Sequence, residues 1–264
     1  MMRRTVFFSV LALCVWSSAG SGVADEVRLE HMTWVEVRDA LQAGKTTVIV
    51  PTGGTEQNGP HMVLGKHNFI VAHTAHHVAE RLGNALVAPV LAYVPEGDIE
   101  NRQGHMAYPG TISVPEKVFA GVLQATAESF RAHGFRTIVF LGDSGGNQRA
   151  QEAVAARLTE AWKTWIGRSP KVFSAKHYYS GNGGDELLVA AGETPGSIGT
   201  HAGIRDTSEM LAVHPEGVDL SLAETGPGEG STGQPGRASA ERGRVLLAAK
   251  IEAAVREIRA FQTR

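Results

Sequence analysis

Short apolar runs rich in β-branched residues alternate with longer segments of helical periodicity along most of the chain. We predict buried strands from the apolar runs, at 46–50, 85–93, 136–141 and 171–175. Helical patterns cover 34–43, 69–82, 115–133, a segment from 148 to about 166, and 238–261. This alternation is typical of a parallel sheet with helices on both faces. We therefore expect a single-domain α/β fold, a three-layer α/β/α sandwich with a mostly parallel sheet.

Two loops that directly follow predicted strands carry many of the polar candidate residues. They span 51–68 and 142–147. In sheets of this kind, ligands bind in the crevice at the carboxyl ends of the strands. The stretch 94–114 is irregular, and the Gly-rich region 180–237 is expected to hold one short helix near 207–214. No internal repeat or linker divides the chain.

The first 24 residues have the three parts of a secretory signal peptide. Two arginines begin it, an apolar run over 5–16 follows, and small residues at 22–24 provide a cleavage site. The apolar run is too short to span a bilayer comfortably. We predict cleavage after Ala24, a mature domain over 25–264, and a periplasmic or secreted location. The single cysteine, Cys14, lies in the segment that would be removed.

Charge and composition exclude two classes of partner. The 264 residues carry 25 Lys and Arg against 27 Asp and Glu, a net charge of −2, so no nucleic-acid partner is expected. No segment after the signal peptide is apolar enough for a transmembrane helix, so no membrane contact is expected after cleavage. The 31 glycines indicate many tight turns or places where the backbone approaches a ligand.

Five motifs, each weak alone, resemble those of the creatininase (creatinine amidohydrolase) family in the same order. The segment PTGGTEQNGPH at 51–61 resembles the start of G-[ST]-x-E-Q-H-G-P-H-L-P-L-G-T-D, and GHMAYPGTIS at 104–113 resembles E-H-x-x-F-P-G-T-x-S. FLGDSGGN at 140–147 stands where the family has a strand ending in N-G-H-G-G-N. HAGIRDTS at 201–208 resembles H-A-G-x-x-E-T-S, and 230–243 resembles G-x-x-G-x-P-x-x-A-x-x-x-x-G. Together they cover nearly the whole mature chain.

The resemblance implies a hydrolase of amide-type C–N bonds, often cyclic ones, that acts on a small-molecule substrate and forms a homo-oligomer. Family members hold two divalent metal ions with carboxylates and imidazoles. Such ions polarise the substrate carbonyl and lower the pKa of a bridging water.

The metal-ligand positions implied by the resemblance are altered in this chain. Glu56 is retained, but Asn58 replaces a ligand histidine, His67 the bridging aspartate and Ser144 another histidine, while Asp206 replaces a glutamate. A neutral imidazole coordinates one metal through one nitrogen, so His67 is unsuited to bridging two ions. We predict at most one divalent ion (zinc, manganese or iron), held by Glu56, His67 and Asp206, or none.

The other candidate residues belong to the same five motifs. His105 and His201 are alternatives to Asp206 as a third ligand, and we also predict catalytic roles for Glu56, His105, His201 and Ser144. The predicted substrate-binding residues are Asn58, His61, Tyr108, Asp143 and Asn147. The expected function is an exported hydrolase of a small polar amide, lactam or related C–N compound.

Two other interpretations stay open. The G-x-S-x-G pattern at 142–146 lies between a predicted strand and helix, as in a nucleophile elbow, and would make Ser144 a metal-independent nucleophile with a histidine as base. A small residue left where a ligand histidine was lost explains Ser144 more simply. The altered ligands are equally compatible with a protein that binds a ligand without turnover.

Two other features have ordinary structural explanations. His73, His76 and His77 share one helix and are expected on its solvated face. Lys66, beside His67 on the first loop, is expected to be solvated as well.

Overall fold

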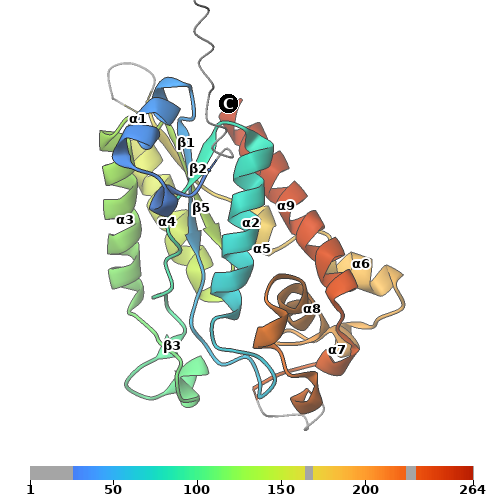
Figure 1. Cartoon of the computed structure of the whole chain (residues 1–264). Coiled ribbons are helices and arrows are strands. Elements are labelled where there is room, and N and C mark those ends of the chain that lie inside the picture. Colours follow the sequence, from blue (N-terminus) through green and yellow to red (C-terminus); the bar gives the residue numbers. More distant parts are fainter. Residues whose placement is uncertain (1–25, 164–168, 224–229, 264) are drawn as a thin grey trace, which may run out of the picture.

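The computed structural model describes residues 26–163, 169–223 and 230–263, and Figure 1 shows the helices gathered around one central sheet. The predicted signal peptide lies outside these ranges. The sheet has four parallel strands in the order β2-β1-β5-β6. Their bounds are β1 Thr47–Thr52, β2 Ala85–Val87, β5 Thr137–Gly142 and β6 Lys171–Ser174.

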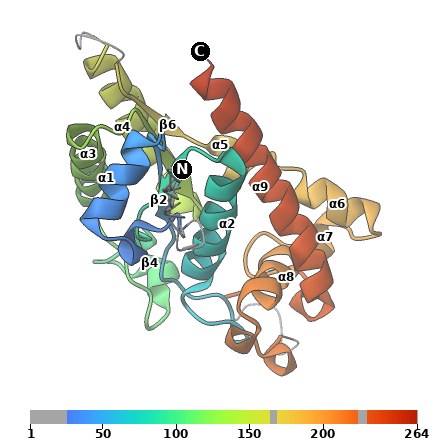
Figure 2. The same cartoon turned by 45° about the horizontal axis from the view of Figure 1, so that its top comes forward.

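Helices cover both faces of the sheet (Figures 1 and 2), which confirms the predicted single-domain α/β/α sandwich. One face packs against α1 (Trp34–Gln42), α3 (Glu116–Ala132) and α4 (Gln148–Ala161). The other packs against α2 (Lys66–Leu82), α5 (Lys176–Tyr179) and α9 (Ala240–Gln262).

The strands divide their side chains between two cores because successive residues point to opposite faces of a sheet. Val48 and Phe140 belong to the core beneath α3 and α4, whereas Ile49 and Val139 belong to the core beneath α2 and α9. All four are fully buried. Burial on both faces explains why these strands read as continuous apolar runs in the sequence.

The structure differs from the sequence predictions at four places. Helix α2 begins at Lys66, three residues before the predicted start, and β2 is only three residues long. The region 94–114 contains a hairpin of β3 (Gly97–Asp98) and β4 (Gln103–Gly104). The prediction of a single helix within 180–237 is wrong, because the segment also folds into two short helices. The three helices are α6 (Gly184–Ala190), α7 (Pro195–Ile198) and α8 (Ile204–Val213).

Short 3₁₀ turns complete the described chain. They are Leu29–His31, His105–Ala107, Gly145–Asn147, Pro215–Gly217, Leu220–Leu222 and Pro235–Arg237. Among the described residues, no helix is both long and apolar enough to cross a membrane.

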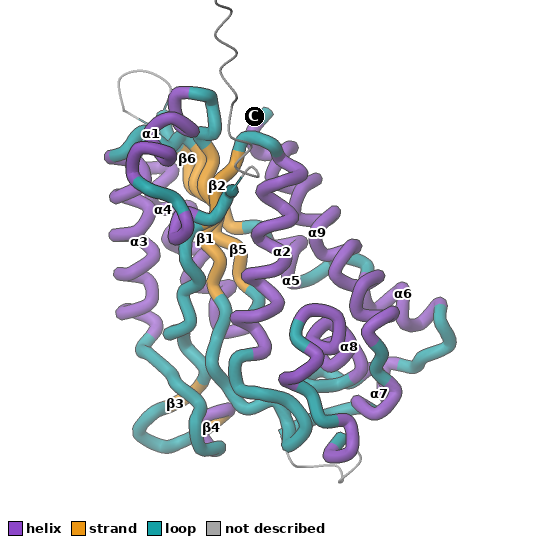
Figure 3. The backbone as a smooth tube through the Cα atoms, viewed as in Figure 1, coloured by secondary structure: helices purple, strands orange, loops and turns teal. Residues whose placement is uncertain are grey.

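The strand order places a crevice at the carboxyl ends of β1 and β5. From β1 the chain passes through α2 to β2 on one side, while β5 and β6 lie on the other side of β1. Parallel sheets bind ligands at such a reversal of strand order. The loops after β1 and β5 leave the sheet at the same end, as the backbone trace in Figure 3 shows.

A close approach of α8 and α9 requires glycine at position 243. A Cβ atom built there would lie 1.8 Å from the Ser208 carbonyl oxygen, whereas one at the exposed Gly121 in α3 would meet nothing within 4 Å. We expect Gly243→Ala to lower the free energy of unfolding by about 1–3 kcal/mol, because overpacking displaces the helices. Gly121→Ala is the matched control and should raise it by about 0.5–1 kcal/mol through helix propensity. Urea denaturation measures both; equal effects would contradict this packing.

Candidate functional site

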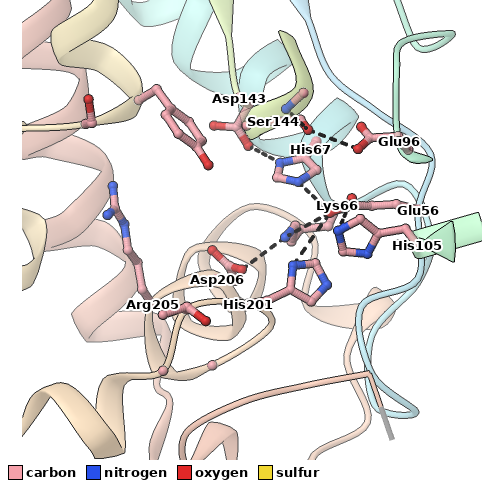
Figure 4. Close-up of a pocket in the computed structure, with 18 of the residues that line it drawn as sticks. Glu56, Lys66, His67, Glu96, His105, Asp143, Ser144, His201, Arg205 and Asp206 are labelled. Carbon is pink, nitrogen blue, oxygen red and sulfur yellow. Dashed lines mark hydrogen bonds and ion pairs between the residues drawn. The ribbon is translucent and has the colours of Figure 1, made fainter. Parts of the chain in front are cut away.

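A cavity of about 730 Å³ opens at the carboxyl ends of β1 and β5, a size suited to a small-molecule ligand. Its walls come from the loops after both strands, the start of α2, the β3–β4 region and the start of α8. Figure 4 shows its charged and polar side chains converging. They are Glu56, Lys66, His67, Glu96, His105, Asp143, Ser144, His201, Arg205 and Asp206.

Glu56 is the buried centre of this arrangement, with only 2% of its surface exposed. Its Oε1 lies 2.8 Å from His67 Nε2 and 3.6 Å from Lys66 Nζ, and its Oε2 lies 3.2 Å from His105 Nε2. Burial by itself would raise the pKa of Glu56, but the hydrogen bond and charge of His67 and the charge of Lys66 hold it well below the usual range. Glu56 is therefore a carboxylate at every physiological pH.

His67 is held between two carboxylates. Its Nε2 contacts Glu56 Oε1 and its Nδ1 contacts Asp143 Oδ2, both at 2.8 Å. Because carboxylates only accept, both ring nitrogens donate and the ring is an imidazolium. Burial and the Lys66 charge oppose this state, but the hydrogen bonds to Asp143 and Glu56 raise the pKa of His67 to about 9. His67 consequently has no lone pair for a metal.

Lys66 is buried, with 1% of its side chain exposed, so the prediction of a solvated lysine is wrong. The early start of α2 is the reason: Lys66 is the first residue of the helix and its side chain enters the cavity. Nζ donates to Asp206 Oδ2 at 3.0 Å. Burial would lower the pKa of Lys66, yet the charges of Asp206 and Glu56 raise it above the usual value. Lys66 is thus a permanent buried cation.

Gln57 orients the two histidines at the cavity mouth. Its Oε1 accepts from Gly59 N–H, so Nε2 faces His105 Nδ1 at 3.0 Å and donates to it. His105 Nε2 then carries the proton and donates to Glu56. His201 Nε2 lies 2.9 Å from the Gln57 carbonyl oxygen, which only accepts, so the lone pair of neutral His201 is on Nδ1, 3.8 Å from Glu56 Oε1. Burial lowers the pKa of His201 to about 4, which keeps the ring neutral at pH 7.

Asp143 ties the cavity to the helices behind it. Its Oδ1 accepts from Tyr178 OH at 2.8 Å and from Lys250 Nζ at 2.9 Å, and Lys250 also donates to Glu209 at 2.6 Å. Asp143 had been predicted to bind substrate, but protein groups contact both of its oxygens. Sequence reasoning missed Lys250 as a site residue, since it does not stand in one of the five motifs.

Glu96 is another buried acid of the site, and it was not predicted from the sequence. Burial and the nearby negative charge of Glu56 raise the pKa of Glu96 to about 8, so its carboxyl is mostly protonated at pH 7. Ser144 Oγ is 3.1 Å from Glu96 Oε2, and within the described ranges Glu96 Oε1 has no hydrogen-bond partner. The glycine at position 146 is the sequence feature that reflects this contact. A Cβ atom at Gly146 would lie 2.0 Å from the Pro95 carbonyl oxygen.

Ser144 has the loop position of a nucleophile elbow but different partners. In the described structure its hydroxyl contacts Glu96 and the Gly146 N–H, and no hydrogen bond joins it to an imidazole. The residue is 2% exposed. This geometry lacks the base that a serine nucleophile needs.

Four residues predicted to bind substrate lie outside the cavity lining. Asn58 and Asn147 are buried and donate to backbone carbonyls of the loop after β1, those of Glu56 and Gly53 among others. His61 Nε2 contacts Thr207 Oγ1 at 3.0 Å. Tyr108 is half-buried beside the 3₁₀ turn that carries His105. The first three stabilise the loops that position the cavity residues.

One candidate metal group lies in the cavity, formed by Glu56, His105 and His201, whose ligand atoms are all within 4.8 Å of one another. It shares only Glu56 with the predicted set of Glu56, His67 and Asp206, because His67 carries two protons and Asp206 pairs with Lys66. A second group, His76, His77 and Glu80, lies on the outer surface of α2.

The family model for creatininase, described as creatinine amidohydrolase, matches residues 30–258. The chain belongs to the creatininase family. A creatinine amidohydrolase of Pseudomonas putida is 28% identical over 202 residues, covering 75% of this chain and 76% of the relative. A mycofactocin precursor peptide peptidase of Mycolicibacterium smegmatis is 31% identical over 191 residues, covering 68% of this chain and 64% of the relative.

A solved manganese form of creatininase has the same fold, with a TM-score of 0.70 and 26% identity over 89% of this chain and 98% of that one. This chain therefore belongs to a family with metal-containing members. Its own residues do not fit a centre of two ions, because His67 and Lys66 place two positive charges against Glu56. The candidate group of Glu56, His105 and His201 is also impaired as a ligand set. In the hydrogen-bond network, His105 Nε2, the nitrogen that faces Glu56, carries a proton.

The raised pKa of Glu96 predicts a pH-dependent stability. The native state keeps the Glu96 proton up to about pH 8, while the unfolded chain releases it near 4.5, so this group makes the free energy of unfolding fall as the pH rises between these values. We expect Glu96→Gln to gain at least about 1 kcal/mol over wild type between pH 5 and pH 8.5. Urea denaturation at both values tests this; a difference that does not change with pH would contradict a protonated Glu96.

Proposed function

We propose that the chain is an exported hydrolase that cleaves the C–N bond of a small polar amide, lactam or related compound in this cavity. One observation carries the proposal: the cavity holds an ionised carboxylate, Glu56, beside a neutral imidazole, His201, whose lone pair faces inward. Family membership supports the C–N class of bond, and the cavity size supports a small substrate.

The cavity residues are suited to a hydrolysis in which water is the nucleophile. In our proposal, His201 Nδ1 accepts a proton as a water molecule attacks the carbonyl carbon, and Glu56 stabilises the resulting imidazolium. Protonated Glu96 donates its proton to the departing nitrogen as the C–N bond breaks. The environments of Glu56 and Glu96 shift their pKa values in opposite directions. Such a pair typically consists of one ionised carboxylate and one carboxylic acid that donates a proton.

Loss of the Glu56 charge should abolish turnover. We expect Glu56→Gln to lower kcat/KM by at least about 100-fold, because the variant no longer stabilises a protonated His201. The measurement is hydrolysis of a panel of lactams, cyclic ureides, simple amides and short peptides. Glu128→Gln, at a half-buried position of α3 outside the cavity lining, is the control. An unchanged rate in Glu56→Gln would refute the proposal. Binding without turnover across the panel would favour a non-catalytic binding protein.

The partners of Ser144 predict that it is not a covalent nucleophile. We expect a fluorophosphonate probe to leave the active protein unlabelled, because no base activates the hydroxyl. Intact-mass spectrometry before and after treatment measures this. Labelling of wild type that disappears in Ser144→Ala would instead establish the serine mechanism.

Export is tested by the N-terminus of the mature protein. We expect the chain recovered from the periplasm or medium to begin at Asp25, as intact-mass spectrometry would show. A cytoplasmic protein that retains residues 1–24 would contradict export. The homo-oligomer implied by the family resemblance stays a prediction, which light scattering of the mature protein would test.

A further inference from the structure

We propose that the ammonium group of Lys66 is the resident cation of this site, in the position where other family members hold a metal ion, and that the pocket works without a divalent metal. Lys66 acts as a positioning residue that fixes the carboxylates of Glu56 and Asp206. The part of this inference that concerns turnover rests on the proposed hydrolase; the part that concerns metal affinity does not.

The contacts of Lys66 are the first observation. Its Nζ lies 3.0 Å from Asp206 Oδ2 and 3.6 Å from Glu56 Oε1. Both acids stand at positions where the family motifs have ligand carboxylates. Asp206 is one methylene shorter than the glutamate of the motif, and this shortening leaves room for an ammonium between the two acids. Figure 4 shows Lys66 reaching between Glu56 and Asp206.

The charges of the site are the second observation. Four carboxylates and four cations are gathered there. The carboxylates are Glu56, Asp143, Asp206 and Glu209, and the cations are Lys66, His67, Lys250 and Arg205. Each carboxylate contacts at least one cation at 3.0 Å or less, so no negative charge remains for an added ion. A divalent ion bound to Glu56 would lie close to both Lys66 and His67, and repulsion at such separations is strong in a buried site.

The place of Lys66 in the chain is the third observation. A lysine at the first position of a helix interacts unfavourably with the helix dipole. Lys66 is both there and fully buried, which is costly unless nearby acids compensate. Local rules are broken in this way mainly at functional sites. The neighbouring His67 adds a second cation in the same helical turn.

Metal affinity provides the test, with Zn²⁺ and Mn²⁺ as probes in isothermal titration calorimetry of the mature protein at pH 7. We expect Lys66→Met, which keeps the length of the side chain and removes its charge, to bind at least tenfold more tightly than wild type at the group of Glu56, His105 and His201. Lys66→Arg, which keeps the charge, should bind as weakly as wild type. The exposed Lys117→Met in α3 controls for loss of a positive charge elsewhere.

Two outcomes of the titration would overturn the proposal. One is a wild-type protein that retains one ion per chain through dialysis against chelator. The other is a folded Lys66→Met that binds no more tightly than wild type. Thermal unfolding establishes that each variant is folded, and if Lys66→Met does not fold, the wild-type and Lys66→Arg titrations still decide. No substrate is needed, so failure of the proposed hydrolase leaves this test intact.

Turnover supplies a second readout. Wild-type activity should change less than twofold after a chelator removes divalent metal ions. Lys66→Ala should lose activity, and methylammonium should restore it, because this small cation occupies the space left by the side chain. The isosteric Lys66→Met leaves no such space and should not be rescued. Loss of wild-type activity on chelation, or a folded Lys66→Ala that methylammonium does not restore, would overturn the metal-independent role of Lys66.

Discussion

The site depends on one buried chain of charges, in which the imidazolium of His67 lies between the carboxylates of Glu56 and Asp143. Each acid follows a different central strand, β1 or β5, and the histidine belongs to the first turn of α2. Two hydrogen bonds of 2.8 Å therefore join the loop after β1, the start of α2 and the loop after β5. Removing the central imidazolium would leave two buried carboxylates facing each other, and the loss of one partner from a buried ion pair costs roughly 3–5 kcal/mol.

A second set of contacts joins this chain to the rest of the domain. Asp143 is also bound by Lys250 of α9 and by Tyr178 of α5, and Lys250 in turn binds Glu209 of α8. Helices α5 and α9 cover the sheet face that also packs against α2, and α8 packs against α2 and α9. The result is a pocket whose acids are already neutralised by protein cations. Substrate binding then needs to displace only solvent from the cavity, and the geometry of the polar groups is set in advance.

Sequence reasoning identified the fold and the two site loops, but it missed Lys66 and Glu96. Lys66 was predicted to be a solvated loop residue for two reasons. Most lysines are exposed, so the residue type does not indicate burial, and α2 was predicted to start three residues too late. Glu96 stands in an irregular stretch, where no periodicity relates it to β1 or β5. Its proximity to Ser144 arises from the packing of the Pro95 backbone against Gly146, a contact between segments about fifty residues apart.

The alternation of strands and helices, the family motifs and the loss of ligand types at Asn58, His67 and Ser144 could all be predicted from the amino-acid sequence. These follow from local periodicity and residue chemistry, which are properties of short segments. The protonation of His67, the burial of Lys66 and the grouping of Glu56, His105 and His201 could not be predicted in this way, because they depend on the folded structure. The charge state of a buried group depends on which partners surround it and how far they exclude water, and folding brings those partners together from distant parts of the chain.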